Sequence, residues 1–210
     1  MSSFGKTLVI RLDPKRPDKR SISYAADALR NGRLVAFPTE TVYGLGASLL
    51  RDEAVKRLYK VKARSRSKPF TVHISNPKLI KEMGCEVPRQ ARALIDKFWP
   101  GPLTVILKSK YGKKVGFRMP ADKIALAVIS AAGVPVVLPS ANLSGKTPPK
   151  NAGEVLAQLG GDIDVLLDGG KTRIGVESTI VDLTTGAPKI LREGAIKSKE
   201  VFKLLNFKRR

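Results

Sequence analysis

The chain has 210 residues, and 42% of them are hydrophobic, which is enough to bury the core of one domain or of two small ones. The chain has 39 lysines and arginines against 18 aspartates and glutamates, so its formal net charge is +21. This excess favours anionic partners such as nucleotides or nucleic acid, although a need for solubility would also explain it. The single cysteine, Cys85, excludes an internal disulfide, and one cysteine with one histidine excludes the usual structural zinc sites.

Apolar runs alternate with amphipathic segments and predict a series of strands and helices. In chain order these are a strand at 7–12, a helix at 21–32, a strand at 33–38, a helix at 52–62, a strand at 70–74, helices at 76–84 and 88–99, strands at 103–108 and 115–119, a helix at 122–133, a strand at 134–139, a helix at 151–161, strands at 165–170, 178–183 and 189–194, and a helix at 198–205. We expect Ser21 or Ser23 to cap the first helix and Asp52 to cap the second. Asn31-Gly32 should end the first helix. Strands separated by helices indicate an α/β fold around a mixed sheet.

The N-terminal sequence lacks the apolar run of a signal peptide, and no apolar stretch is long enough to span a bilayer. No low-complexity linker divides the chain. We therefore expect a cytoplasmic protein with no membrane partner, which forms a single domain over residues 1–210.

Two segments share one plan. LVAFPTET and PVVLPSAN each place a proline, a hydroxyl residue and a further polar side chain directly after a buried strand. In α/β sheets, ligands bind at the carboxyl ends of the strands. The pair therefore indicates a binding site, although two ordinary turns would use the same residue types.

A basic stretch begins at the end of the second predicted helix, and no carboxylate lies between Glu53 and Glu82. Its cations occupy every second position, namely Lys60, Lys62, Arg64, Arg66 and Lys68. In an extended segment these side chains would share one face, which suits a polyphosphate better than a solvated surface, where both signs normally mix. Lys62 also lies at the end of the apolar stripe of the helix. A lysine that faces the core needs an anionic partner, unless its stem extends far enough for the amine to reach water.

Two Gly-Lys-Thr sequences, at 145–147 and 170–172, do not form a Walker A phosphate loop. That motif needs a glycine five residues before the Gly-Lys pair, and Ser140 and Val165 occupy those positions. The basic stretch therefore stays the main candidate for phosphate binding. His73, the only histidine, follows this stretch. A single histidine within a strand favours a structural role over a catalytic one, but its position beside the cations makes the two roles more nearly equal.

Motifs spread from Val35 to Gly194 carry a family resemblance. They are FPTETVYGLG (37–46), YKVKAR (59–64), KPFTVHI (68–74), FWPGPLTVIL (98–107), VGFRMP (115–120), LPSANLSGKTPP (138–149), DGGKTRIGVESTIVDL (168–183) and ILREG (190–194). With them the chain resembles the Sua5/YrdC/YciO family, and within it the threonylcarbamoyl-AMP synthases of the short YrdC-like form. The resemblance implies an α/β fold with a YrdC-like twisted mixed β-sheet, helices packed around it and a basic concave cleft, without a C-terminal Sua5 domain.

The resemblance also implies an activity, that of an L-threonylcarbamoyladenylate synthase. Such a nucleotidyltransferase makes threonylcarbamoyl-AMP and pyrophosphate from L-threonine, bicarbonate and ATP, and Mg²⁺ would arrive with the ATP. The product serves the t6A37 modification of tRNA, so tRNA or the transferase machinery would act downstream. Positioning and cationic stabilisation carry most of such chemistry, which fits a site without an obvious nucleophile.

Site residues follow from the resemblance, position by position. The catalytic residues would be Lys62 and Arg64; the L-threonine contacts would be Thr41, His73, Arg118 and Ser178; the ATP contacts would be Arg64, Lys68, Ser140, Asn142 and Arg192; no metal ligand is expected. Arg118 is suited to clamp the amino acid's carboxylate in a bidentate pair. Three positions depart from the family's usual pattern, since Ser65, Lys68 and Glu193 stand where Pro, Asn and Pro are frequent.

Two other functions fit some of these features. A non-catalytic RNA-binding module of the same fold would account for the net charge, but no aromatic residues cluster with the cations as a stacking platform for bases would require. A carbamoyl-adenylate domain acting on carbamoyl phosphate is a weaker alternative, because that chemistry usually lies inside larger chains.

Overall fold

The computed structural model describes residues 6–206. The strands are β1 (Leu8–Arg11), β2 (Val35–Phe37), β3 (Gly44–Ser48), β4 (Val72–His73), β5 (Leu103–Lys108), β6 (Lys114–Arg118), β7 (Val136–Val137), β8 (Val165–Asp168), β9 (Thr179–Asp182) and β10 (Lys189–Arg192). The helices are α1 (Lys19–Arg30), α2 (Asp52–Val61), α3 (Lys78–Glu82), α4 (Arg89–Phe98), α5 (Lys123–Ala132), α6 (Ala152–Leu159) and α7 (Ser198–Leu204). The strands form one mixed sheet in the order β1-β8-β2-β3-β7-β4-β6-β5-β9-β10. The predicted α/β fold around a mixed sheet is confirmed.

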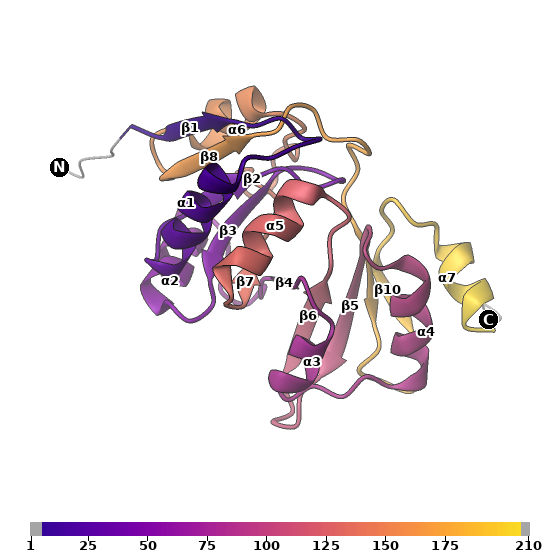
Figure 1. Cartoon of the computed structure of the whole chain (residues 1–210). Coiled ribbons are helices and arrows are strands. Elements are labelled where there is room, and N and C mark those ends of the chain that lie inside the picture. The colour runs from indigo at the N-terminus through magenta and orange to yellow at the C-terminus, as the bar shows by residue number, and fades with distance from the viewer. Residues whose placement is uncertain (1–5, 207–210) are drawn as a thin grey trace.

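Both faces of the sheet carry an apolar core. Successive side chains of β2 point to opposite faces, so Val35 and Phe37 pack in one core with α1 and α5, whereas Ala36 packs in a second core. The second core takes in residues of α2, α4, α6 and α7. Figure 1 shows β1, β8, α1 and α5 at one end of the molecule, and β5, β6, β10, α4 and α7 at the other. Burial on both faces explains why the strand sequences are nearly continuous apolar runs.

The helix boundaries differ from prediction at two N-termini. The side chain of Asp18 accepts a hydrogen bond from Ser21 N, so Asp18 caps α1 and the prediction of a serine cap is wrong. Asp52 is the first residue of α2 rather than its cap, and its charge lies in the first turn, where it complements the helix dipole. The predicted end of α1 is confirmed, since Asn31 is the C-cap and Gly32 follows with φ of 78°.

Strand β3 was missing from the predicted elements. Its sequence, GLGAS, contains no β-branched or aromatic residue, and two glycines normally weaken a strand. Both glycines are needed here, because an added Cβ would lie 2.6 Å from Leu138 at Gly44 and 3.0 Å from Phe37 at Gly46. Strand β3 therefore forms because it packs closely against its neighbours, despite the low strand propensity of its residues.

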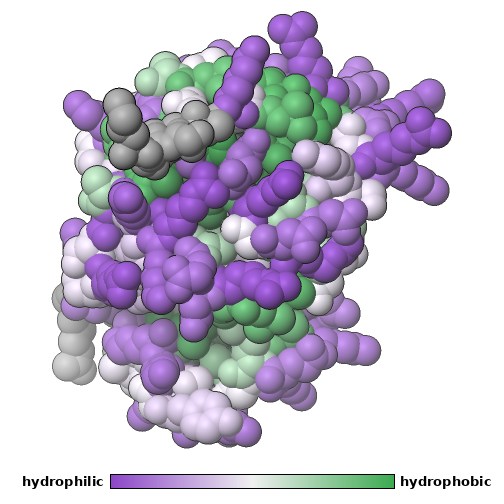
Figure 2. Space-filling view, turned by 90° about the vertical axis from the view of Figure 1, so that its left-hand side faces the viewer, coloured by the Kyte–Doolittle hydropathy of each residue, from purple (hydrophilic) through white to green (hydrophobic). Residues whose placement is uncertain are grey.

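Long hydrophilic side chains cover most of the face shown in Figure 2, with apolar patches between them. Edge strand β1 contributes the exposed Leu8 and Val9 to the apolar part of the surface. No helix among residues 6–206 combines the length and the apolar character needed to cross a bilayer.

Candidate active site

A cleft opens where the two Pro-hydroxyl loops meet. Gly44, at the start of β3, forms an isolated antiparallel bridge with Ser140, and Ala141 N donates to Tyr43 O over 2.8 Å. The two segments that share a sequence plan are therefore neighbours in space. The cleft beside them has about 620 Å³ of empty space, part of it open to solvent.

Most of the predicted site residues lie around this cleft. The ones that line it are Thr41, Arg64, His73, Arg118, Ser140, Ser178 and Arg192. Lys62, Lys68 and Asn142 are not among the lining residues. Glu177 is the one carboxylate among the described lining residues, so three arginines face a single acid.

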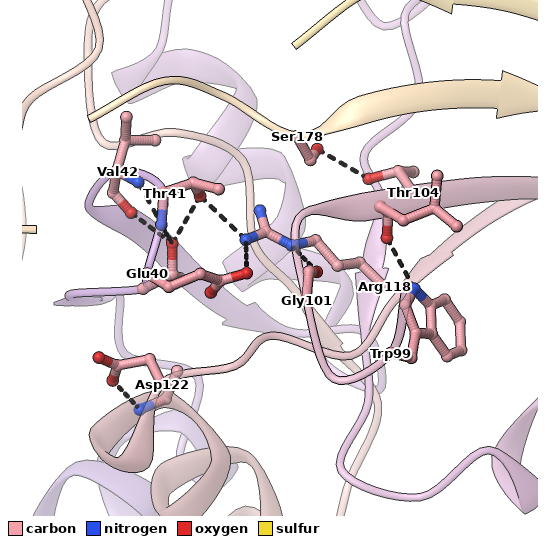
Figure 3. A network of polar contacts seen from close by, with 12 residues as sticks. Glu40, Thr41, Val42, Trp99, Gly101, Thr104, Arg118, Asp122 and Ser178 are labelled. Carbon is pink, nitrogen blue, oxygen red and sulfur yellow. Dashed lines mark hydrogen bonds and ion pairs between the residues drawn. The ribbon is translucent and has the colours of Figure 1, made fainter. Parts of the chain in front are cut away.

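Arg118, at the end of β6, is held in a buried ion pair (Figure 3). Its Nη2 donates to Glu40 Oε1 over 2.8 Å and to Thr41 Oγ1 over 2.9 Å, and its Nε donates to the Gly101 carbonyl over 3.3 Å. The side chains of Arg118 and Glu40 are 6% and 1% exposed, so each charge depends on the other for compensation. Among the contacts of the described residues, none involves Nη1, and this leaves that nitrogen as the donor available to a ligand.

The loop that carries Glu40 is fixed by its threonines. Thr39 Oγ1 donates to the Val42 carbonyl over 2.7 Å and accepts from the backbone N–H groups of Thr41 and Val42. A second loop lies across it, since Ile174 N and Gly175 N donate to the carbonyls of Glu40 and Thr41, each over 2.8 Å. Because the backbone is bonded from both sides, Arg118 meets a rigid partner.

His73 is buried between two strands. β4 pairs with β6 and with β7, and this places His73 opposite Arg118 in one register and Val136 in the other. Burial lowers the pKa of His73 well below its usual value, and the nearby Arg118 charge lowers it further. The imidazole is therefore neutral at pH 7 and is available as a hydrogen-bonding group rather than as a charge.

On the opposite wall, Ser178 links β5 to β10. Its hydroxyl lies 2.9 Å from Thr104 Oγ1 and accepts from Arg192 Nη2 over 3.2 Å. Arg192 Nε also donates to the Ser178 carbonyl over 3.0 Å, and Arg192 Nη1 pairs with Glu177 Oε1 at 2.5 Å. Figure 3 shows the Ser178–Thr104 pair and the guanidinium of Arg118, and these three residues line the same cleft as Arg192. The two arginines of the predicted threonine and ATP sites therefore approach one hollow from different strands.

Lys62 lies behind the cleft wall. It is 2% exposed, and its Nζ donates to the carbonyls of Ser140 over 2.5 Å and Asn142 over 2.6 Å. Burial lowers the pKa of Lys62 to about 8, with a further decrease from Arg64 and an opposing effect of Glu177. At neutral pH the amine is therefore still mostly protonated, and it anchors the Ser-Ala-Asn loop to α2.

The basic stretch is not extended, so the prediction of one shared cationic face is wrong. α2 continues to Val61, and the chain then turns through Ala63 with φ of 46°. Arg64 alone of the five cations lines the cleft, with its Nε donating to the Lys68 carbonyl over 3.0 Å and its guanidinium over the Phe70 ring. Lys60, Arg66 and Lys68 have exposed side chains. Residues at every second position share one face only in an extended strand. Here the end of α2 and the following turns interrupt the segment, so the alternate spacing did not predict where the cations lie.

Asn142 points into its own loop rather than into the cleft. Its Nδ2 donates to the carbonyls of Leu143 and Lys146, over 2.8 and 2.7 Å. Its buried Oδ1 has no hydrogen-bond partner among the described residues. The amide therefore shapes the loop that presents Ser140.

The sequence profile of the Sua5/YciO/YrdC family, which carries the description "Telomere recombination", matches residues 27–194. The chain belongs to this family. It is 42% identical over 208 residues to the threonylcarbamoyl-AMP synthase of Pyrococcus abyssi, a match that covers 95% of this chain and 61% of that protein. It is also 42% identical over 190 residues to the threonylcarbamoyl-AMP synthase of Bacillus subtilis, with 86% and 55% covered. The chain thus spans about three fifths of the length of these curated relatives or somewhat less.

Shorter relatives and solved structures agree with this assignment. A putative threonylcarbamoyl-AMP synthase of Mycobacterium tuberculosis is 35% identical over 202 residues, with 92% of both chains covered. The crystal structure of P. abyssi Sua5 complexed with L-threonine has a TM-score of 0.90 and 41% identity, covering 95% of this chain and 61% of that one. Escherichia coli YciO has a TM-score of 0.83 and 25% identity, covering 92% and 98%. The predicted YrdC-like fold is confirmed.

Within this Sua5/YciO/YrdC fold, one departure from the family's usual pattern has a clear structural role. Glu193 Oε2 accepts from Ser198 N over 2.9 Å and from the Ser198 hydroxyl, and Glu193 Oε1 lies 3.6 Å from Lys197 Nζ. The side chain therefore caps the first turn of α7. Ser65 stays in the turn after α2, where its hydroxyl lies 2.8 Å from that of Ser67.

Sequence reasoning missed several polar groups of the site, among them Glu40, Thr104 and Glu177. Glu40 stands between two threonines in a strongly basic chain, and that isolation was the available signal. Thr104 and Glu177 gave no signal, because only the β5–β9 pairing brings their segments together. Among residues 6–206, no group of three or more His, Cys, Asp or Glu side chains is placed to hold a metal ion.

Proposed function

We propose that the protein is an L-threonylcarbamoyladenylate synthase, a nucleotidyltransferase that converts L-threonine, bicarbonate and ATP into threonylcarbamoyl-AMP and pyrophosphate. The observation that carries the proposal is the cleft itself, where Arg64, Arg118 and Arg192 converge beside Ser140 and Ser178. The family relatives named threonylcarbamoyl-AMP synthase, and the P. abyssi Sua5 complex with L-threonine, support the same conclusion.

The amino acid would bind against Arg118. Glu40 and Gly101 hold this guanidinium from behind, which leaves Nη1 to meet a carboxylate. The contact would therefore be made mainly through one nitrogen, and the bidentate clamp that the residue type suggests would need Nη2 to be shared with Glu40. Thr41, His73 and Ser178 would supply neutral hydrogen-bonding groups around the rest of the amino acid.

The nucleotide's phosphates would lie toward Arg64, Ser140 and Arg192. Among the described residues, Arg64 hydrogen-bonds only through its Nε, which leaves its two terminal nitrogens for a ligand. A carbamate oxygen attacks the α-phosphate while negative charge builds on the departing pyrophosphate, so fixed cations that meet this charge lower the barrier. Lys62 would act from behind, by holding the loop that presents Ser140. Lys68 is exposed and would reach the phosphates from the rim.

Mg²⁺ would accompany the ATP. This ion keeps several waters and is usually held by substrate phosphates with one or two carboxylates. The cleft fits that arrangement rather than a cage built from protein ligands, since Glu177 is its one lining carboxylate among the described residues. When bound, the ion would neutralise phosphate charge; the residues described above would orient the substrates.

The product would then be used for the t6A37 modification of tRNA, so tRNA or its threonylcarbamoyltransferase machinery would act downstream. For this role the protein would act in the cytoplasm, where tRNA and ATP are present. The relatives' shared name, threonylcarbamoyl-AMP synthase, supports this placement in the reaction sequence.

Pyrophosphate release tests the proposed activity. We expect release from ATP only when L-threonine and bicarbonate are both present, because the attacking carbamate forms from these two substrates. Release should fall to background when either is omitted or when L-threonine is replaced by L-valine, which lacks the hydroxyl group. Steep salt-dependent RNA binding without pyrophosphate release would instead support a non-catalytic RNA-binding module.

A further inference from the structure

Glu177 pairs with Arg192 and is the one carboxylate among the described lining residues, but no contact with the amino-acid substrate has been assigned to it. It lines the cleft with Arg64, Arg118 and Arg192, and its Oε1 pairs with Arg192 Nη1 at 2.5 Å. Its influence extends beyond that pair. Burial lowers the pKa of Arg118, and the carboxylates of Glu40 and Glu177 act in the opposite direction. A single carboxylate therefore faces guanidinium groups on two walls of the cleft.

The backbone under Glu177 is held in place. Ala195 N donates to the Glu177 carbonyl over 3.0 Å. The contact is so close that a Cβ added at Gly194 would lie 2.2 Å from the same carbonyl oxygen, so only glycine fits there. The Glu177 side chain is about one-third exposed and can turn about this fixed base.

An amino acid that enters the cleft carries a negative carboxylate and a positive ammonium group. Its carboxylate finds guanidinium groups, but its ammonium group needs an acceptor, preferably an anion. The other polar side chains lining the cleft carry neutral hydroxyls, the neutral His73 imidazole or cations. Glu177 is thus the one described lining group of opposite charge.

Arg192 does not need Glu177 in order to stay in place. Its Nε and Nη2 bond to the carbonyl and hydroxyl oxygens of Ser178, independently of the carboxylate. When Glu177 turns away, Arg192 therefore keeps its position and gains a free Nη1 for a phosphate oxygen.

We propose that Glu177 binds the α-ammonium group of the amino-acid substrate and leaves Arg192 to the nucleotide. This role rests on the proposed function, because it takes an amino acid as the ligand of the cleft. It makes Glu177 a specificity-determining residue: ligands with a free α-amine bind, and otherwise identical ligands without one bind less well.

A cycle of two ligands and two proteins tests this role. L-threonine and (R)-3-hydroxybutyrate, which differ only in the amine, are titrated into the wild type and into Glu177→Gln by calorimetry, without ATP or magnesium. In the wild type we expect L-threonine to bind at least about tenfold more tightly, a factor that corresponds to about 1.4 kcal/mol. In Glu177→Gln that ratio should fall toward one through loss of L-threonine affinity, while the 3-hydroxybutyrate affinity is unchanged or higher. Glutamine keeps the shape and a hydrogen bond to Arg192, so folding should be preserved.

Glu53→Gln is the matched control, since it makes the same chemical change in an exposed ion pair with Lys56 on α2. It should keep the wild-type ratio and the wild-type pyrophosphate release. If Glu177→Gln keeps the full preference for L-threonine, or weakens both ligands equally, Glu177 does not recognise the amine and the proposal is overturned. A wild type that neither binds L-threonine nor releases pyrophosphate would overturn the proposed function and this role with it.

Discussion

Arg64→Ala lowers the rate of pyrophosphate release by at least about 100-fold, the usual effect of removing one fixed group that meets transition-state charge. The same change leaves stability almost unaltered, because among the described residues the partly buried Arg64 side chain makes one hydrogen bond, to the Lys68 carbonyl, and one ring contact, with Phe70. We expect a loss of no more than about 1 kcal/mol in the free energy of unfolding. Steady-state kinetics and urea denaturation measure the two effects separately.

Arg66→Ala is the control for this prediction, since it removes an exposed cation from the same turn. It should retain wild-type kinetics. Lys62→Ala should differ from both variants by lowering activity and stability together, because it leaves the carbonyls of Ser140 and Asn142 without their buried donor. Comparable activity in Arg64→Ala and Arg66→Ala would mean that Arg64 does not meet the phosphates.

Glu40→Gln is expected to lower the free energy of unfolding by about 3–5 kcal/mol, because it leaves the guanidinium of Arg118 buried without its counter-charge. For a protein of this length the loss corresponds to a decrease in melting temperature of about 6–20 °C. Thermal denaturation by circular dichroism measures it.

The double variant Glu40→Gln/Arg118→Met separates ion pairing from packing. It removes both charges, so it should recover much of the stability that Glu40→Gln loses, although it lacks the arginine needed for activity. Glu53→Gln, in an exposed pair, should shift the unfolding free energy by less than about 1 kcal/mol. A Glu40→Gln melting temperature equal to that of Glu53→Gln would show that Arg118 does not depend on Glu40.

Sequence patterns predicted best the elements whose own apolar residues form the buried surface. α5 and β5 bury nearly continuous apolar runs and appear close to their expected bounds. β3 could not be predicted, because its glycines are selected by the space beside Leu138 and Phe37 rather than by strand propensity. β7 is shorter than expected because Pro135 and Pro139 flank it and have no N–H group for the ladder.

The candidate site was predicted in part. The shared plan of two loops located the cleft, and seven of the residues that the family resemblance named line it. The alternate spacing of the cations did not predict which of them reach the cleft. Lys62 is turned inward to backbone carbonyls, whereas Arg66 is exposed to solvent. The roles of Glu40 and Glu177 follow from their ion-pair partners Arg118 and Arg192, and the sequence alone does not show these pairings.

In the proposed reaction, one cleft joins an amino acid, bicarbonate and a nucleotide. The most direct test is mass spectrometry of the products formed from L-threonine, ATP and isotope-labelled bicarbonate. We predict an AMP-linked product that contains threonine and carries the isotope label, formed together with pyrophosphate. An adenylate that forms without the label or without threonine, or ATP left unchanged by the wild-type protein, would contradict the proposed reaction.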